Sequence, residues 1–90
     1  MFLTGQKTLT TSGTAYPIGS GNINQGILIR SASTNTGRVY IGNQAVTIAT
    51  GFILDAGEVT IIDEVGKASD IYAVGSVNSQ VISWMTTNEI

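Results

Sequence analysis

With 90 residues, the chain has the size of one domain, which we expect to span residues 1–90. Its 42% hydrophobic content excludes intrinsic disorder, and its four scattered Lys and Arg residues, against six Asp and Glu, exclude a basic surface for nucleic acid. The absence of His and Cys excludes disulfides and the common catalytic triads, and no apolar run approaches the length of a membrane span.

Segments rich in Val, Ile, Thr and aromatic residues recur between clusters of Gly, Asn and Ser. A spacing of roughly eight to twelve residues between such segments is typical of β-sandwiches and barrels. The first two predicted strands cover residues 8–11 and 15–18. The single proline, Pro17, indicates an edge position for the second of them, because proline cannot donate to a neighbouring strand.

The clearest predicted strand covers residues 26–33 and begins with apolar residues on both of its faces, which indicates a central position. The Thr-Asn-Thr-Gly segment at residues 34–37 has the composition of a tight turn. We therefore expect a β-hairpin that joins residues 26–33 to a strand at residues 38–42.

The second half of the chain continues the same pattern. Polar turns are predicted at residues 55–58 and 77–79, and a polar connection with room for one helical turn is predicted at residues 63–69. The remaining predicted strands cover residues 45–49, 52–54, 59–62, 70–75 and 80–87. The expected fold is an all-β, antiparallel sandwich or jelly roll of about eight short strands.

The surface of this domain is expected to carry few charges. Charged residues make up 11% of the chain, whereas an ordinary soluble domain has about 25%. A covering of Ser, Thr, Asn, Gln and Gly suits closely packed interfaces, where an unpaired charge would cost desolvation energy. The composition predicts a component of an assembly, and a soluble monomer with a neutral surface is the alternative.

The acidic residues do not form a recognisable catalytic or metal-binding motif. Asp55 and Glu58 bracket a predicted turn, where acids cap backbone donors. Asp63, Glu64 and Asp70 offer oxygen ligands for calcium, but their spacing fits no EF-hand loop, and a solvated acidic loop is the preferred interpretation. We predict no catalytic residue, no metal, no cofactor and no small-molecule substrate.

Four aromatic residues leave a second functional class open. Tyr16, Tyr40, Tyr72 and Trp84 would form a carbohydrate-binding platform if they shared one exposed face. Each of them lies within an apolar strand segment, and strand aromatics are more often core or interface residues. A core or subunit-interface role is therefore preferred over a carbohydrate-binding module.

The order of the motifs carries a resemblance to a known family. Residues 9–15 read Leu-Thr-Thr-Ser-Gly-Thr-Ala, and residues 27–42 contain Ser-Thr-Asn-Thr-Gly followed by Val-Tyr-Ile-Gly. Residues 51–61 contain Leu-Asp-Ala-Gly-Glu, and residues 70–75 read Asp-Ile-Tyr-Ala-Val-Gly. Together these motifs resemble the small head-decoration, or cement, proteins of tailed bacteriophages over nearly the whole chain.

This resemblance implies a non-enzymatic virion protein with a jelly-roll-like fold. Members of the family bind the outside of the phage head, commonly as homotrimers, and stabilise the lattice of the major capsid protein. The chain would then be made in the host cytoplasm and act on the capsid surface. A structural role in the phage tail or baseplate is the alternative, because the shared motifs are structural and not chemical.

On this interpretation the candidate functional residues are those that would contact other subunits. The apolar N-terminal residues are a candidate docking arm, with a disordered end as the alternative. The two arginines are candidates for inter-subunit ion pairs, with solvated surface charges as the alternative. The complete set of candidate interface residues is Met1, Phe2, Leu3, Arg30, Arg38, Tyr40, Tyr72 and Trp84.

Overall fold

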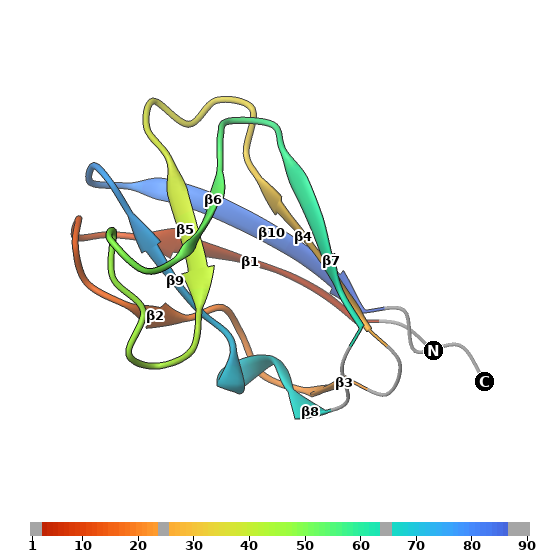
Figure 1. The fold of residues 1–90 in the computed structure, drawn as a ribbon. Coiled ribbons are helices and arrows are strands. Elements are labelled where there is room, and N and C mark those ends of the chain that lie inside the picture. Colours follow the sequence, from red (N-terminus) through yellow and green to blue (C-terminus); the bar gives the residue numbers. More distant parts are fainter. Residues whose placement is uncertain (1–2, 24–25, 64–65, 87–90) are drawn as a thin grey trace.

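The computed structural model describes residues 3–23, 26–63 and 66–86, and it arranges them in two four-stranded antiparallel sheets and a two-stranded ribbon (Figure 1). The predicted all-β sandwich is confirmed. In chain order the elements are β1 (Thr4–Leu9), β2 (Tyr16–Pro17), β3 (Asn22–Ile23), β4 (Ile27–Ser31), β5 (Val39–Gly42), β6 (Phe52–Leu54), β7 (Val59–Ile62), β8 (Gly66–Lys67), the 3₁₀ helix η1 (Ala68–Asp70), β9 (Tyr72–Gly75) and β10 (Gln80–Thr86).

Strand pairing follows one simple rule along the chain. Sheet A has the order β1-β10-β4-β7, sheet B has the order β2-β9-β5-β6, and β3 pairs with β8. The first strand therefore pairs with the last, the second with the ninth, and so on inward to the pair β5–β6. The described chain is one long antiparallel hairpin, which is rolled up so that β10 also pairs with β4 and β9 with β5.

The main core lies between the two sheets and follows from the alternation along the strands. On β4, Ile27 and Ile29 are fully buried whereas Arg30 is exposed, and on β10 the buried residues include Ile82 and Trp84. These inward-facing residues pack against Val39 and other apolar residues of sheet B in one cluster. The two sheets thus bury one face each, as expected for a sandwich.

The outer face of sheet B has a second, smaller core. Tyr40 and Val74 point to this side and pack with Val46, which belongs to the loop between β5 and β6. Gly42 and Gly51 flank the loop, and a Cβ at either position would lie within 3 Å of the Val46 side chain. The loop therefore folds back over sheet B and covers Tyr40 and Val74. The prediction of a strand at residues 45–49 was wrong, because this segment forms turns and its Val46 side chain packs over Tyr40 and Val74.

The predicted hairpin between residues 26–33 and 38–42 was also wrong, because β4 belongs to sheet A and β5 to sheet B. The Asn35 side chain explains the crossing. Its Nδ2 donates to Ser31 Oγ and to the Val81 carbonyl, and its Oδ1 accepts from the Val81 N–H, each at 2.8 Å. These bonds hold the connection against β10, so the chain continues into the opposite sheet.

The edge position predicted for Pro17 is confirmed, since β2 ends sheet B. Other predictions differ from the structure in detail. The first strand begins at Thr4, four residues before the predicted start at residue 8, and ends at Leu9. A helical turn occurs as η1, which overlaps the end of the connection predicted at residues 63–69 and extends to Asp70, and the connection also contains the strand β8. In the part of the chain that the structure describes, no helix is long and apolar enough to cross a membrane.

Candidate interaction surface

The outer face of sheet A carries apolar side chains that the fold leaves uncovered. The strand register aligns Met85 of β10, Leu28 of β4 and Ile61 of β7 in one row across the sheet. Arg30 of β4 lies beside Val59 of β7 in the next row. We refer to these five residues as the β7 patch. Ile61 is 60% exposed and Val59 is 49% exposed, so much of the patch faces solvent.

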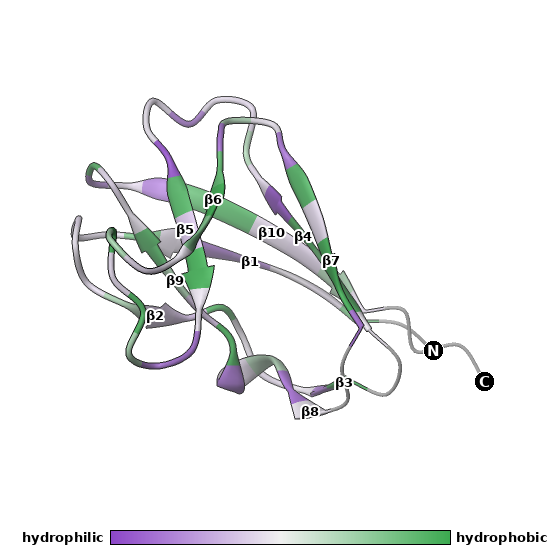
Figure 2. Ribbon diagram, viewed as in Figure 1, coloured by the Kyte–Doolittle hydropathy of each residue, from purple (hydrophilic) through white to green (hydrophobic). Residues whose placement is uncertain are grey.

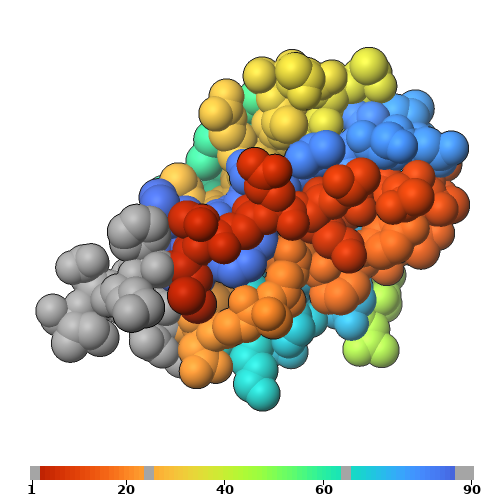
Figure 3. Space-filling view, turned by 180° about the vertical axis from the view of Figure 1, so that it is seen from behind, coloured from red at the N-terminus to blue at the C-terminus, as the bar shows by residue number. Residues whose placement is uncertain are grey.

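The β7 patch continues into a shallow hollow of about 370 Å³ on the same face. Leu28, Arg30 and Met85 form part of its lining, and Thr4 and Gln6 of β1 contribute polar groups on the far side. Figure 3 views the molecule from behind and shows β1, in red, running along the surface with parts of β10, in blue, beside it. An apolar centre with a polar border is the usual composition of a protein contact surface.

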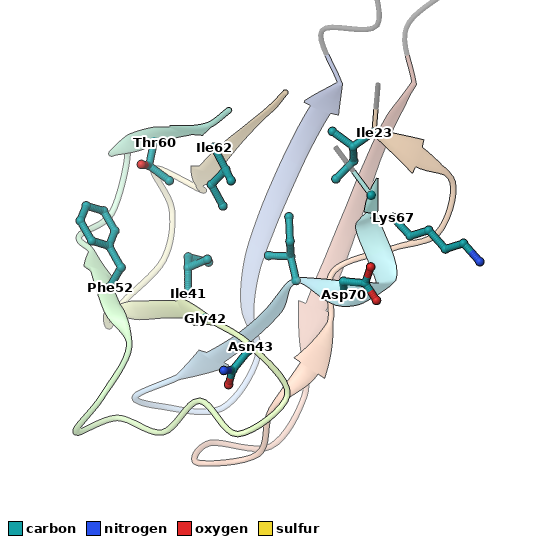
Figure 4. A pocket seen from close by; sticks show the side chains of 11 residues that line it. Ile23, Ile41, Gly42, Asn43, Phe52, Thr60, Ile62, Lys67 and Asp70 are labelled. Carbon is teal, nitrogen blue, oxygen red and sulfur yellow. The ribbon is translucent and has the colours of Figure 1, made fainter. Parts of the chain in front are cut away.

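A second hollow opens at the edge of the sandwich, between β6 and β7 (Figure 4). This cavity has a volume of about 420 Å³. Its lining includes Phe52 from β6, Thr60 and Ile62 from β7, and Lys67 and Asp70 from the segment that covers one end. Phe52 is 61% exposed at this opening. The cavity offers an apolar surface with few polar groups and can accept an apolar side chain or a small apolar ligand.

The four strand edges of the two sheets are protected to different degrees. The β1 edge contains Lys7, and the β2 edge is two residues long and contains Pro17. The β6 edge is three residues long. Short strands, lysine and proline are common protections against strand pairing. The β7 edge, Val59–Ile62, is one residue longer than the β6 edge and contains neither lysine nor proline, and Figure 2 shows hydrophobic colouring along this strand.

The candidate docking arm is only partly within the described chain. Met1 and Phe2 lie outside the described residues. Leu3 is half-buried and packs against the main core. Its N–H donates to Thr86 Oγ1 and its carbonyl accepts from the Thr86 N–H, both at 2.8 Å. Leu3 is thus held by the chain's own last strand.

The two candidate arginines lie in different surroundings. Arg38 Nε donates to Asp55 Oδ1 at 2.8 Å, so its partner belongs to the same chain. Attraction by the Asp55 carboxylate, followed by this hydrogen bond, raises the pKa of the Arg38 guanidinium above its ordinary value. Arg30 is exposed at the centre of the outer face of sheet A and forms no ion pair with a described residue.

The candidate aromatic residues do not gather on one exposed face. Trp84 lies in the main core, where its Nε1 donates to the Ile18 carbonyl at 2.9 Å. Tyr40 is buried in the small core on the other side of sheet B, and the half-buried Tyr72 packs against it. Tyr16 is half-buried beneath the Lys7 ammonium group, 5.5 Å from its ring centre. The structure therefore uses these rings mainly for packing.

The acidic residues described by the structure have mainly structural surroundings. The Asp55–Glu58 turn forms as predicted, with the Glu58 N–H donating to the Asp55 carbonyl at 2.9 Å and Glu58 Oε1 accepting from the Asp55 N–H at 2.8 Å. Among residues 3–23, 26–63 and 66–86, no group of three His, Cys, Asp or Glu side chains is placed to hold a metal ion. Glu64, the third candidate calcium ligand beside Asp63 and Asp70, lies outside these ranges.

Several exposed apolar residues were not among the interface candidates predicted from the sequence. Val59, Ile61 and Met85 are exposed on the outer face of sheet A, and Phe52 is exposed at the cavity. For Val59 and Ile61 a signal was present in the sequence, because three of the four residues at positions 59–62 are apolar. Such a run reads as buried on both faces, so its exposure follows from the edge position and not from the local sequence.

Comparison with known proteins adds no family assignment to this geometry. No family model matches the chain, and no curated protein matches it either. The functional conclusion therefore depends on the residues and surfaces described above.

Proposed function

We propose that this chain is a structural virion protein that decorates the outside of a phage head and stabilises the lattice of the major capsid protein. The observation that carries the proposal is the apolar, uncovered outer face of sheet A next to an unprotected strand edge. A small domain gains stability when a partner covers such a surface. A neutral surface with 11% charged residues also suits close packing against other proteins.

The strand order supports the jelly-roll form that the family resemblance implies. When the β3–β8 ribbon is set aside, the eight remaining strands have the orders 1-8-3-6 and 2-7-4-5 in the two sheets. This is the arrangement produced by rolling up one long hairpin so that its two arms alternate between sheets. The strand order and the motif resemblance thus support the same proposal.

The mechanism in this proposal is mechanical and not chemical. A decorating subunit that binds only the mature lattice stabilises it by linkage, because expansion or rupture must first break the added contacts. Several weak contacts in one oligomer strengthen each other through high effective concentration when they can engage together. The resemblance implies a trimer, and we include self-association in the proposal.

The test is co-sedimentation of the purified protein with DNA-filled heads of the phage that encodes it, after the heads have been stripped of decoration. Saturable binding to heads, together with a higher temperature of DNA release, would support the proposal. Binding to isolated tails and not to heads would move the protein to the tail or baseplate. Binding to neither particle would refute a virion role.

A further inference from the structure

The β7 edge presents unpaired backbone groups to solvent. The Ser31 N–H donates to the Glu58 carbonyl, and the Ser31 carbonyl accepts from the Gly57 N–H, both at 2.9 Å. Bonding directions alternate along antiparallel strands, so the strand register directs the backbone groups of Thr60 toward β4. The N–H and C=O groups of Val59 and Ile61 therefore point away from the sheet, which is the arrangement that accepts another strand.

The side chains on this edge favour a protein partner. Ile61 and Val59 are more than two-fifths exposed. Ile61 continues the row of apolar residues formed by Leu28 and Met85, and Val59 lies on the same face in the next row, beside Arg30. A β-branched strand without charge, proline or glycine has a high tendency to pair with another strand. A fifth strand added to β7 would cover both the open backbone groups and the apolar patch.

Charges at the two ends of β7 have opposite signs. Arg30 lies beside Val59 at the start of the strand. Asp63 directly follows the strand and is exposed. Continuing the alternation of β7 by one residue assigns Asp63 to the face of Val59 and Ile61. Neither charge forms an ion pair with a described residue. Glu58, the other acid at the start of β7, accepts a hydrogen bond from the Asp55 N–H.

We propose that β7 pairs antiparallel with β7 of a second copy of this chain, about a two-fold axis that passes between the two Ile61 residues. In this register Val59 lies opposite Asp63 of the second copy. Arg30 and that Asp63 are then two strand spacings apart, roughly 10 Å between their Cα atoms, a gap that an extended arginine and an aspartate together span. The symmetry forms this ion pair twice.

A two-fold axis requires a surface that is complementary to itself. The β7 edge meets this requirement, because Arg30 of the neighbouring strand β4 lies beside the first residue of β7 and Asp63 follows the last. Antiparallel pairing brings each charge toward its opposite on the second copy. The product is one continuous sheet made of two four-stranded sheets. Its outer face has the two β7 patches joined at the centre, with the ion pairs on either side.

This contact deepens the proposed function, since it names a surface through which the protein would assemble. The edge geometry favours two copies where the family resemblance implies three. The contact does not depend on a phage head, so the two proposals are tested separately. A monomer in solution would refute the β7 contact and not head binding, and absence of head binding would not refute the β7 contact.

The test is sedimentation equilibrium of the purified protein and of matched variants over a wide concentration range. The wild-type protein is expected to approach the mass of two chains, and Ile61→Lys to raise the dimer dissociation constant by about tenfold or more, because a charge at the edge opposes strand addition. Val77→Lys is the control, since Val77 is also exposed but lies between β9 and β10. Far-UV circular dichroism verifies that each variant folds.

Charge reversal tests the register. Arg30→Asp and Asp63→Arg are each expected to weaken the dimer, and the double variant R30D/D63R to recover much of the loss, because the pair is re-formed with the signs exchanged. Three results would overturn the proposal. These are a wild-type monomer at all concentrations, a trimer whose mass Ile61→Lys leaves unchanged, and charge effects that add without recovery in the double variant.

Discussion

The packing of Trp84 against two glycines makes a quantitative prediction for the substitution Gly19→Ala. A Cβ at position 19 would lie 2.4 Å from Cζ2 of Trp84, and one at position 5 would lie 2.6 Å from the same atom. Ordinary contact begins near 3.4 Å, so the indole or the backbone must move by about 1 Å. Overpacking of this kind costs about 1–3 kcal/mol. In a domain of this size, a loss of 2 kcal/mol lowers Tm by roughly 8–16 °C.

Urea unfolding with far-UV circular dichroism can separate this steric cost from other effects. In a Trp84→Phe background the atoms that meet the new Cβ are absent, so Gly19→Ala should cost less than about 0.5 kcal/mol there. Trp84→Phe alone should destabilise by about 1–3 kcal/mol, because it leaves the buried Ile18 carbonyl without its donor. Gly5→Ala provides a second measurement of the same clash. Equal costs for Gly19→Ala in both backgrounds would refute the explanation.

Three further predictions concern turns and surface charge. Asn35→Ala should destabilise by about 1–3 kcal/mol in urea unfolding, because it removes three hydrogen bonds and leaves the Val81 N–H without its acceptor, whereas the Val81 carbonyl keeps its bond from the Ala32 N–H; a neutral effect would contradict the role given to Asn35 at the sheet crossing. Gly57→Ala should cost about 1–2 kcal/mol, since Gly57 has φ of 84°, and an unchanged Tm would speak against this strain. Asp55→Asn should lower Tm only slightly in low salt and not at all in high salt. The reason is that both side chains of the Arg38–Asp55 pair are more than half exposed, so solvent and salt screen their attraction. A large decrease in Tm that persists in high salt would contradict this explanation.

Local sequence patterns predicted the strands that have a strong alternation and one buried face. The segments around β4 and β10 are examples, since Ile27, Ile29, Ile82 and Trp84 share the inward faces that their spacing indicated. The Asp55–Glu58 turn was also predictable, because its residue types determine its hydrogen bonds. In each case the information lies within a few neighbouring residues.

Pairing partners were not predictable in the same way. The Thr-Asn-Thr-Gly segment has the composition of a hairpin turn, but the bonds from Asn35 to Val81 join positions 46 residues apart. The apolar content of residues 45–49 indicated a strand, whereas Val46 covers the outside of sheet B. Two-residue strands such as β3 and β8 are too short to leave a pattern. Each of these features depends on contacts between distant parts of the chain.

The candidate site was predictable only at the level of residue class. Composition indicated a surface suited to contacts, but it did not indicate that Val59, Ile61 and Met85 are exposed together on the outer face of sheet A. Tyr40 and Trp84, which were candidates for an interface, fill the interior of this chain. An aromatic or aliphatic residue in a strand looks the same from the sequence whether its strand ends a sheet or lies inside one, so exposure required the strand order.

The nested pairing of the strands has a consequence for the order in which the protein folds during synthesis. Sheet A cannot close until β10 is available, because β10 lies between β1 and β4. The first strand must therefore leave the ribosome and remain unpaired until almost all of the described chain has been made. Folds dominated by such distant contacts fold slowly, typically in milliseconds to seconds. During this interval the apolar β4 and β7 segments are exposed and can associate with other chains. The yield of folded protein therefore depends on the time that translation takes to reach β10.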